Sequence, residues 1–276
     1  MKRFVMAATM IMTIAVSAMA QEKIVYVHDT VFVEKPETEV VEEAPAKNNW
    51  GAKLKESNFH LGLDLQTKYI WRGMETMTED AAPVLFPGVN YQYKGLCVYA
   101  MGGYAINGKY AEVDLGASYT WKGLTVGFND YYYPTVSGAD DEYFKGGKNT
   151  GHWLEACITY APEKVPLWIT VSNFFAGADK YENENGEMKN AYSTYFELGT
   201  YYDFLKSNRI AAAVGMTPSR SCYNGYEKKF NVCNVDLKYT YNVSFKSGWT
   251  LPLSVEYIYN PVYDKSHVNF IANLAF

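Results

Sequence analysis

Acidic and basic side chains recur at even spacing along this chain, in stretches where every second residue is apolar. In residues 59–72, Asp64, Lys68 and Arg72 follow one another at intervals of four. Residues at even spacing on a strand share one face, so such charges meet on the same side of a sheet. The set with this placement is Asp64, Lys68, Arg72, Glu112, Asp114, Glu155, Glu197, Asp236, Lys238 and Glu256.

This charged face supports two interpretations. Its members can bridge one another into a polar network that holds a narrow barrel in shape. They can also line a water-filled pore, and because seven of the ten are acids, that pore would weakly favour cations. The same ten residues are therefore pore-lining candidates and bridging candidates.

A catalytic site would need a nucleophile beside a histidine. Thr150 is close to His152 in the sequence but no serine is, and Ser266 and His267 are strand neighbours whose side chains point to opposite faces. No nucleophile-elbow or zinc motif is present, and the acidic run 182–187 does not fit calcium-loop spacing. We predict no catalytic residue, no metal and no cofactor, with a lipid hydrolase as the least favoured alternative.

The elements that must position these charges are long alternating strands. One face of residues 59–72 is mainly apolar, with Phe59, Leu61, Leu63, Leu65, Thr67, Tyr69 and Trp71, and the other is mainly polar, with His60, Gly62, Asp64, Gln66, Lys68, Ile70 and Arg72. A strand this long suits a tilted crossing of a bilayer. Similar segments are expected near 83–94, 96–105, 110–121, 124–133, 151–161, 167–175, 191–202, 209–217, 230–242, 249–259 and 267–276, which makes twelve strands.

The connections between these strands alternate in length. Lys94-Gly95 and Lys122-Gly123 read as two-residue turns, whereas 134–150, 176–190 and 218–229 are long. Short periplasmic turns, longer outer loops and an even strand count are typical of outer-membrane barrels, which must close so that no edge is left unpaired. Tyr and Trp residues gather at both expected ends, as in two aromatic girdles. We predict an all-β protein, a transmembrane antiparallel β-barrel spanning residues 58–276.

The two ends of the chain indicate export to the outer membrane. Residues 1–20 have a basic start, an apolar run and Ala18-Met19-Ala20, which predicts a cleaved signal peptide. Residues 21–57 are acidic with prolines, which predicts a periplasmic tether or a docking strand for a periplasmic partner. The final strand ends on Phe276, which resembles the signal that the barrel-assembly machinery recognises. The remaining expected partners are outer-membrane lipid and lipopolysaccharide of a Gram-negative cell.

Charge and cysteines add further limits. The chain after residue 20 has 23 basic and 30 acidic residues, because Lys2 and Arg3 leave with the signal. This balance argues against a nucleic-acid partner. The four cysteines match no metal spacing. Cys222 and Cys233 flank one expected outer loop and could form a disulfide in an oxidising compartment.

Several stretches resemble the TorF porin family. They are Tyr69-Ile70-Trp71-Arg72-Gly73, Gly88-Val89-Asn90-Tyr91, Glu112-Val113-Asp114-Leu115, Tyr131-Tyr132-Tyr133-Pro134, and Tyr195-Phe196-Glu197-Leu198-Gly199. The resemblance covers roughly residues 58–276 and implies an outer-membrane porin without catalytic residues. Residues 21–57 are a departure from the family pattern.

Three functions follow as hypotheses from these features. The first is a porin that lets small solutes pass passively, with a weak preference for cations. The second is a closed barrel that acts as a scaffold or surface-binding protein through its loops or residues 21–57. The lipid hydrolase is the third.

Overall fold

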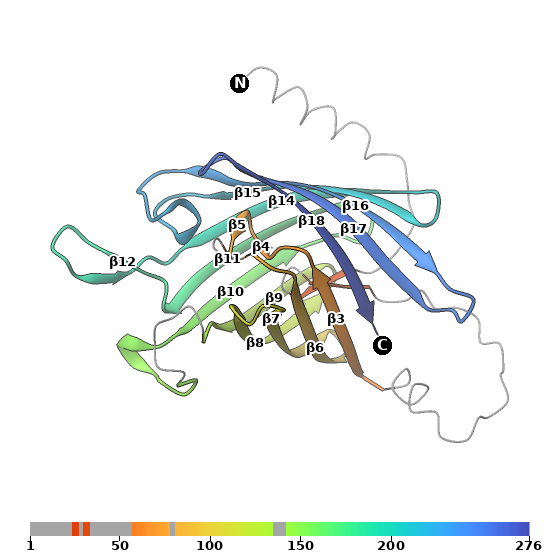
Figure 1. The fold of residues 1–276 in the computed structure, drawn as a ribbon, viewed down its shortest axis with the longest axis horizontal. Coiled ribbons are helices and arrows are strands. Elements are labelled where there is room, and N and C mark those ends of the chain that lie inside the picture. Colours follow the sequence, from red (N-terminus) through yellow and green to blue (C-terminus); the bar gives the residue numbers. More distant parts are fainter. Residues whose placement is uncertain (1–23, 28–29, 34–56, 78–80, 135–141, 276) are drawn as a thin grey trace, which may run out of the picture.

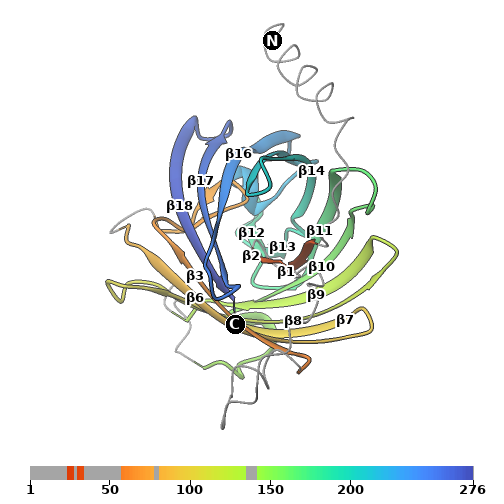
Figure 2. The ribbon, with the colours of Figure 1, turned by 90° about the vertical axis from the view of Figure 1, so that its right-hand side faces the viewer.

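Twelve antiparallel strands close into one barrel in the computed structural model, which describes residues 24–27, 30–33, 57–77, 81–134 and 142–275. Each strand pairs with its neighbour in the sequence, and β18 pairs with β3 to complete the ring (Figure 2). The fold is therefore the predicted transmembrane β-barrel, without an open edge. The barrel strands are β3 (Phe59–Gln66), β6 (Val84–Tyr93), β7 (Leu96–Ala105), β8 (Ala111–Trp121), β9 (Leu124–Tyr132), β10 (His152–Tyr160), β11 (Leu167–Gly177), β14 (Thr194–Phe204), β15 (Asn208–Thr217), β16 (Asn231–Ser244), β17 (Thr250–Asn260) and β18 (Lys265–Ala275).

The alternation in the sequence sets which side chains face lipid and which face the lumen. On β16, Leu237 and Tyr239 are exposed on the outer surface, whereas Asn234, Asp236 and Lys238 face inward and line the lumen. Large apolar side chains are exposed around the whole ring, from Leu61 on β3 to Phe270 on β18. An apolar exterior of this kind suits the hydrocarbon core of a membrane, which the outward-facing apolar band of such barrels contacts.

The two ends of the barrel differ in their connections (Figure 1). At one end, here called the turn end, two-residue turns join β6 to β7 and β8 to β9, with positive φ at Lys94, Gly95, Lys122 and Gly123. Such φ values match the strand twist in tight hairpins. The opposite end, here called the loop end, carries the hairpin β12 (Lys180–Glu182) and β13 (Met188–Asn190) and the short helices η1 (Gly147–Asn149) and η2 (Cys222–Asn224).

The first barrel strand is shorter than its sequence pattern predicts. The alternation runs to Arg72, but β3 ends at Gln66 and the chain then turns into the lumen. Asn269 of β18 holds this departure, because its Oδ1 accepts hydrogen bonds from the Lys68 N–H (3.0 Å) and the Thr67 hydroxyl (3.1 Å). The prediction of one strand through Arg72 was wrong.

Residues 67–77 form a small hairpin inside the barrel, called here the inner hairpin. Its strands are β4 (Ile70–Trp71) and β5 (Met74–Glu75), joined by Arg72 and Gly73. Figure 2 shows this orange segment within the ring of strands. Tyr69, Ile70 and Trp71 are all buried, so both faces of the short strand contact protein instead of lipid or water.

Near the N-terminus, β1 (Ile24–Val27) pairs with β2 (Thr30–Val33) as a separate two-stranded sheet. The predicted signal peptide and most of the predicted tether lie outside the described residues. Across the described part of the chain, no helix has the length and apolar character needed to cross a membrane.

Candidate functional site

The lumen is divided into a packed half and a hollow half. The packed half lies against β6 to β11, where large inward side chains form one continuous core with the inner hairpin. Val84, Phe86, Tyr99, Tyr131 and Phe174 belong to this core and are almost completely buried. These side chains occupy the lumen on that side of the barrel as one packed cluster.

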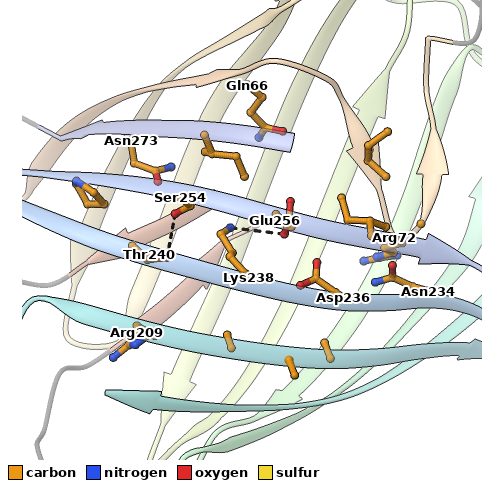
Figure 3. A pocket seen from close by; sticks show the side chains of 18 of the residues that line it. Gln66, Arg72, Arg209, Asn234, Asp236, Lys238, Thr240, Ser254, Glu256 and Asn273 are labelled. Carbon is orange, nitrogen blue, oxygen red and sulfur yellow. Dashed lines mark hydrogen bonds and ion pairs between the residues drawn. The ribbon is translucent and has the colours of Figure 1, made fainter. Parts of the chain in front are cut away.

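The hollow half is a cavity of about 190 Å³. Its wall comes mainly from β14 to β18 and from β3, and the inner hairpin borders it at the loop end, where Arg72 lies on the right of Figure 3. The volume has room for several water molecules beside its polar groups. The polar side chains that line it are Gln66, Arg72, Glu197, Arg209, Asn234, Asp236, Lys238, Thr240, Asn242, Ser254, Glu256 and Asn273.

Carboxyl groups dominate the chemistry of this cavity. The Lys238 ammonium lies 3.7 Å from Glu256 Oε1, and Asp236 lines the cavity beside this pair (Figure 3). Glu197 accepts hydrogen bonds from Trp168 Nε1 at 2.7 Å and from the Tyr195 hydroxyl at 2.8 Å. These bonds fix the carboxyl groups at the wall and leave them facing the cavity.

The charges of the lining do not cancel. Arg209 is held by Asp203 in a two-point ion pair of 2.5 and 2.8 Å, and Arg72 is likewise paired with a carboxylate. Lys238 then faces Glu197, Asp236 and Glu256. One ammonium against three carboxylates leaves the formal charge of this part of the lining negative.

The tip of the inner hairpin has the backbone of a tight turn. Arg72 and Gly73 both have positive φ, 50° and 81°, as the central residues of a two-residue hairpin require. A Cβ atom on Gly73 would lie 2.2 Å from the Cys233 carbonyl oxygen, so only glycine fits against β16 at this point. The Gly73 carbonyl in turn accepts a hydrogen bond of 2.9 Å from the buried Asn260 amide.

Arg72 extends from this tip into a preformed pocket. Its two terminal nitrogens bond the two oxygens of Glu155 at 2.5 and 3.1 Å, and the same two nitrogens also donate to the Tyr223 hydroxyl at 2.6 Å and the Ser172 hydroxyl at 3.2 Å. The guanidinium carbon also lies 4.8 Å from the centre of the Tyr195 ring. This arrangement is a bidentate ion pair in an aromatic surround, one of the stronger ways to hold a cation.

The inner hairpin and the loop that contains η2 together close the loop end of the cavity. Trp71 packs against Tyr223 of η2, with ring centres 5.6 Å apart. The Ser221 hydroxyl caps η2 by accepting from the Tyr223 N–H, and Asn224 donates to three carbonyls of its own loop. The described residues therefore show a barrel whose hollow half ends at Arg72 and Gly73.

The ten candidate residues divide between the two halves. Arg72, Glu197, Asp236, Lys238 and Glu256 line the cavity. Lys68 pairs with Glu75 at 3.8 Å within the inner hairpin. The other four are buried away from the cavity lining, because large neighbours cover them: Asp64, Glu112, Asp114 and Glu155.

The buried acids are held by neutral donors or by the hairpin. Glu112 accepts from the hydroxyls of Tyr110 at 2.7 Å and Tyr69 at 3.4 Å, and Asp64 accepts from Asn273 at 2.8 Å. Glu112 therefore belongs to the packed half, whereas Asp64 on β3 bonds Asn273 of the cavity lining. Both carboxyl groups fit the bridging interpretation, whereas the five cavity residues fit the pore-lining one.

Two of the described histidines, His152 and His267, each lie beside a carboxylate. His152 Nδ1 lies 2.8 Å from Asp130, and its Nε2 faces the Tyr143 carbonyl. His267 lies in the lumen 4.0 Å from Glu75, while the adjacent Ser266 bonds the Tyr257 hydroxyl on the other face. The geometry gives neither ring a hydroxyl to activate.

The disulfide suggested by the sequence is not formed. Cys222 and Cys233 are both free thiols. The backbone N–H of Cys222 is anchored to the Ser193 hydroxyl at 2.8 Å, and Cys233 is fully buried. Burial raises the pKa of the Cys222 thiol, which disfavours the thiolate that disulfide exchange requires.

Searches for similar proteins give a resemblance of fold. No protein-family model and no curated protein matches the chain, so membership of the TorF family stays a prediction. Among solved structures, the NanC porin is 11% identical, covers 78% of this chain and 98% of its own, and has a TM-score of 0.47. The CymD monoaromatic hydrocarbon channel is 9% identical over 79% and 87%, with a TM-score of 0.42. OccK8 (OprE) of Pseudomonas aeruginosa is 12% identical over 81% and 68%, with a TM-score of 0.37.

Sequence analysis missed several members of the site. Trp168, Arg209 and Asn234 line the cavity but carry no motif. The inner hairpin had a signal, because Arg72-Gly73 repeats the basic residue and glycine of the turns Lys94-Gly95 and Lys122-Gly123. A two-residue turn in the middle of an alternating run thus marks a strand that folds back.

Proposed function

We propose that this protein is an outer-membrane channel of a Gram-negative cell that passes small solutes, weakly favours cations and is closed here by its inner hairpin. The observation that carries the proposal is the hollow half of the lumen, with its net negative lining between Asn242 near the turn end and Arg72 under the loop end. A barrel that served only as a wall would gain stability by filling this space with apolar side chains. The apolar exterior supports the outer-membrane location.

The orientation in this proposal has the turn end in the periplasm and the loop end outside. Long loops on the outer side and short periplasmic turns are the usual arrangement of such barrels. We include in the proposal the TorF relationship, a periplasmic segment at residues 21–57, contact with lipid and lipopolysaccharide, and insertion by the barrel-assembly machinery through Phe276. The sequence motifs and the terminal strand support these points.

The test is the single-channel conductance of the refolded mature protein in a planar bilayer under a potassium chloride gradient. We expect rare, discrete steps with a reversal potential on the cation side, because the hairpin must leave before ions pass. Heat-modifiable migration on a gel is the control for folding. A folded barrel that stays silent, even after substitutions that release the hairpin, would favour the closed scaffold instead.

A further inference from the structure

The pocket around Arg72 is more elaborate than a structural ion pair needs. Its parts come from four separate elements: Glu155 from β10, Ser172 from β11, Tyr195 from β14 and Tyr223 from η2. Glu155 is completely buried, and Ser172 is 1% exposed. The Tyr131 hydroxyl and the Asn129 amide donate to Glu155 at 2.8 and 3.3 Å, so the carboxylate is held in place independently of Arg72.

The chemistry of this pocket selects one type of cation. Both Glu155 oxygens meet nitrogens of one planar group, which matches the fork of a guanidinium and not the single point charge of an ammonium. The rings of Tyr195 and Tyr223 lie 4.8 and 5.8 Å from the guanidinium carbon, and the Tyr223 and Ser172 hydroxyls accept a second hydrogen bond from each terminal nitrogen. Both terminal nitrogens of the guanidinium are thus recognised by groups that lie outside the inner hairpin.

The pocket also borders the hollow half of the lumen. Arg72 borders the cavity beside Asn234 and Asp236 (Figure 3). Tyr195, which faces Arg72, donates its hydroxyl to the cavity carboxylate Glu197. A cation drawn into the acidic cavity thus arrives beside the pocket. The backbone of Arg72 is at φ 50°, a conformation that costs a non-glycine residue energy and makes the docked turn easier to displace.

We propose that Arg72 is an internal ligand, and that a small solute bearing a guanidinium group binds in its place against Glu155, Ser172, Tyr195 and Tyr223 and thereby opens the channel. The solute fits only after Arg72 has left, so it binds the open state selectively and shifts the population toward it. The opening step rests on the proposed function, whereas the binding step does not. Loss of Arg72 alone would leave the buried Glu155 without a cation, which favours capture of the solute.

The binding test uses methylguanidinium chloride as the probe and N-methylurea as its uncharged counterpart. In the refolded mature protein, Arg72→Ala removes the guanidinium that competes with the probe for the pocket. The polypeptide holds that guanidinium at the pocket at a millimolar or higher effective concentration. We expect methylguanidinium to bind this variant at least about tenfold more tightly than wild type in calorimetric titration, and methylurea to bind neither. Adding Glu155→Gln to Arg72→Ala is expected to abolish binding.

Arg220→Ala is the matched control variant, because the Arg220 guanidinium also lies over a tyrosine ring, 4.1 Å from that of Tyr181, but outside the lumen pocket. It is expected to bind the probe as wild type does. Equal binding by Arg72→Ala and Arg220→Ala, or binding that survives Glu155→Gln, would overturn the proposal. If Arg72→Ala fails to show heat-modifiable migration, Arg72→Met keeps the apolar stem and takes its place.

A second measurement needs no variant. In planar bilayers, methylguanidinium is expected to raise the open probability of the wild-type channel, whereas methylurea, or sodium chloride at the same ionic strength, leaves it unchanged. An equal response to methylguanidinium and sodium would refute the opening step. Binding by Arg72→Ala without current under any condition would instead refute the channel function and leave the binding site standing.

Discussion

Gly73→Ala is the sharpest test of closure by the inner hairpin. The substitution adds one methyl group at φ 81°, where a Cβ would lie 2.2 Å from the Cys233 carbonyl oxygen. Left-handed φ alone costs a non-glycine residue about 1–2 kcal/mol. That strain is relieved when the hairpin leaves the lumen, so it alone raises the ratio of open to closed barrels by about 5- to 30-fold. The collision with β16 raises the ratio further.

Gly108→Ala is the control for this prediction. Gly108 has a similar φ of 71°, but a Cβ there meets nothing within 4 Å. It therefore carries the same backbone strain without contact with the lumen. The assays are open probability in planar bilayers and cleavage of residues 67–77 by added protease. If both variants conduct and resist protease equally, the hairpin does not close the barrel.

Three further predictions concern charge and the loop end. Glu256→Gln is expected to lower the cation-to-anion permeability ratio roughly fivefold at low salt. This is the effect of about 1 kcal/mol, the interaction of a unit charge with an ion about 4 Å away in water. Glu112→Gln, in the packed half, is the control and is expected to leave the reversal potential unchanged. Burial raises the pKa of Asp179 above its ordinary 3.8, although hydrogen bonds from Ser193 oppose this rise. The folded protein therefore binds the Asp179 proton more tightly than the unfolded chain does. The resulting stabilisation is complete below pH 3.8 and is lost as pH rises through the raised pKa. Asp179→Asn is expected to flatten this fall in the unfolding temperature between acidic and neutral pH; an identical pH profile for both proteins would refute the assignment. Because Cys222 and Cys233 are free thiols, a reducing agent is expected to change neither gel mobility nor unfolding temperature, and a shift in either would restore the disulfide.

The sequence predicts the barrel well because strand period and turn chemistry are local. Residues that alternate between lipid and lumen must alternate in polarity, and Lys94-Gly95 and Lys122-Gly123 mark the turns directly. The strand that was predicted too long shows the limit of this reasoning. Beyond Gln66 the alternation continues while the contacts change, since Trp71 packs on Tyr223 instead of lipid.

The alternation in the sequence could not predict which half of the lumen is packed, because that depends on the sizes of side chains that face one another across the barrel. Inward positions on β6 and β7 carry Phe86, Tyr99 and Met101, which fill the space before them. Inward positions on β15 carry Ala211 and Ala213, which leave it empty. Alternation reports polarity and direction, but not the volume that remains between facing strands.

The packed half and the hollow half of the lumen tolerate different kinds of amino-acid substitution. Where β6 to β11 face the packed half, adding or removing even one methylene group disturbs the packing of neighbouring side chains. Substitutions at these positions must therefore compensate one another in volume. Where β15 to β17 face the cavity, a side chain can change charge without leaving a void. Solute selectivity can therefore change in evolution through a few substitutions on the cavity side of the ring. The packing of the opposite side maintains the fold meanwhile.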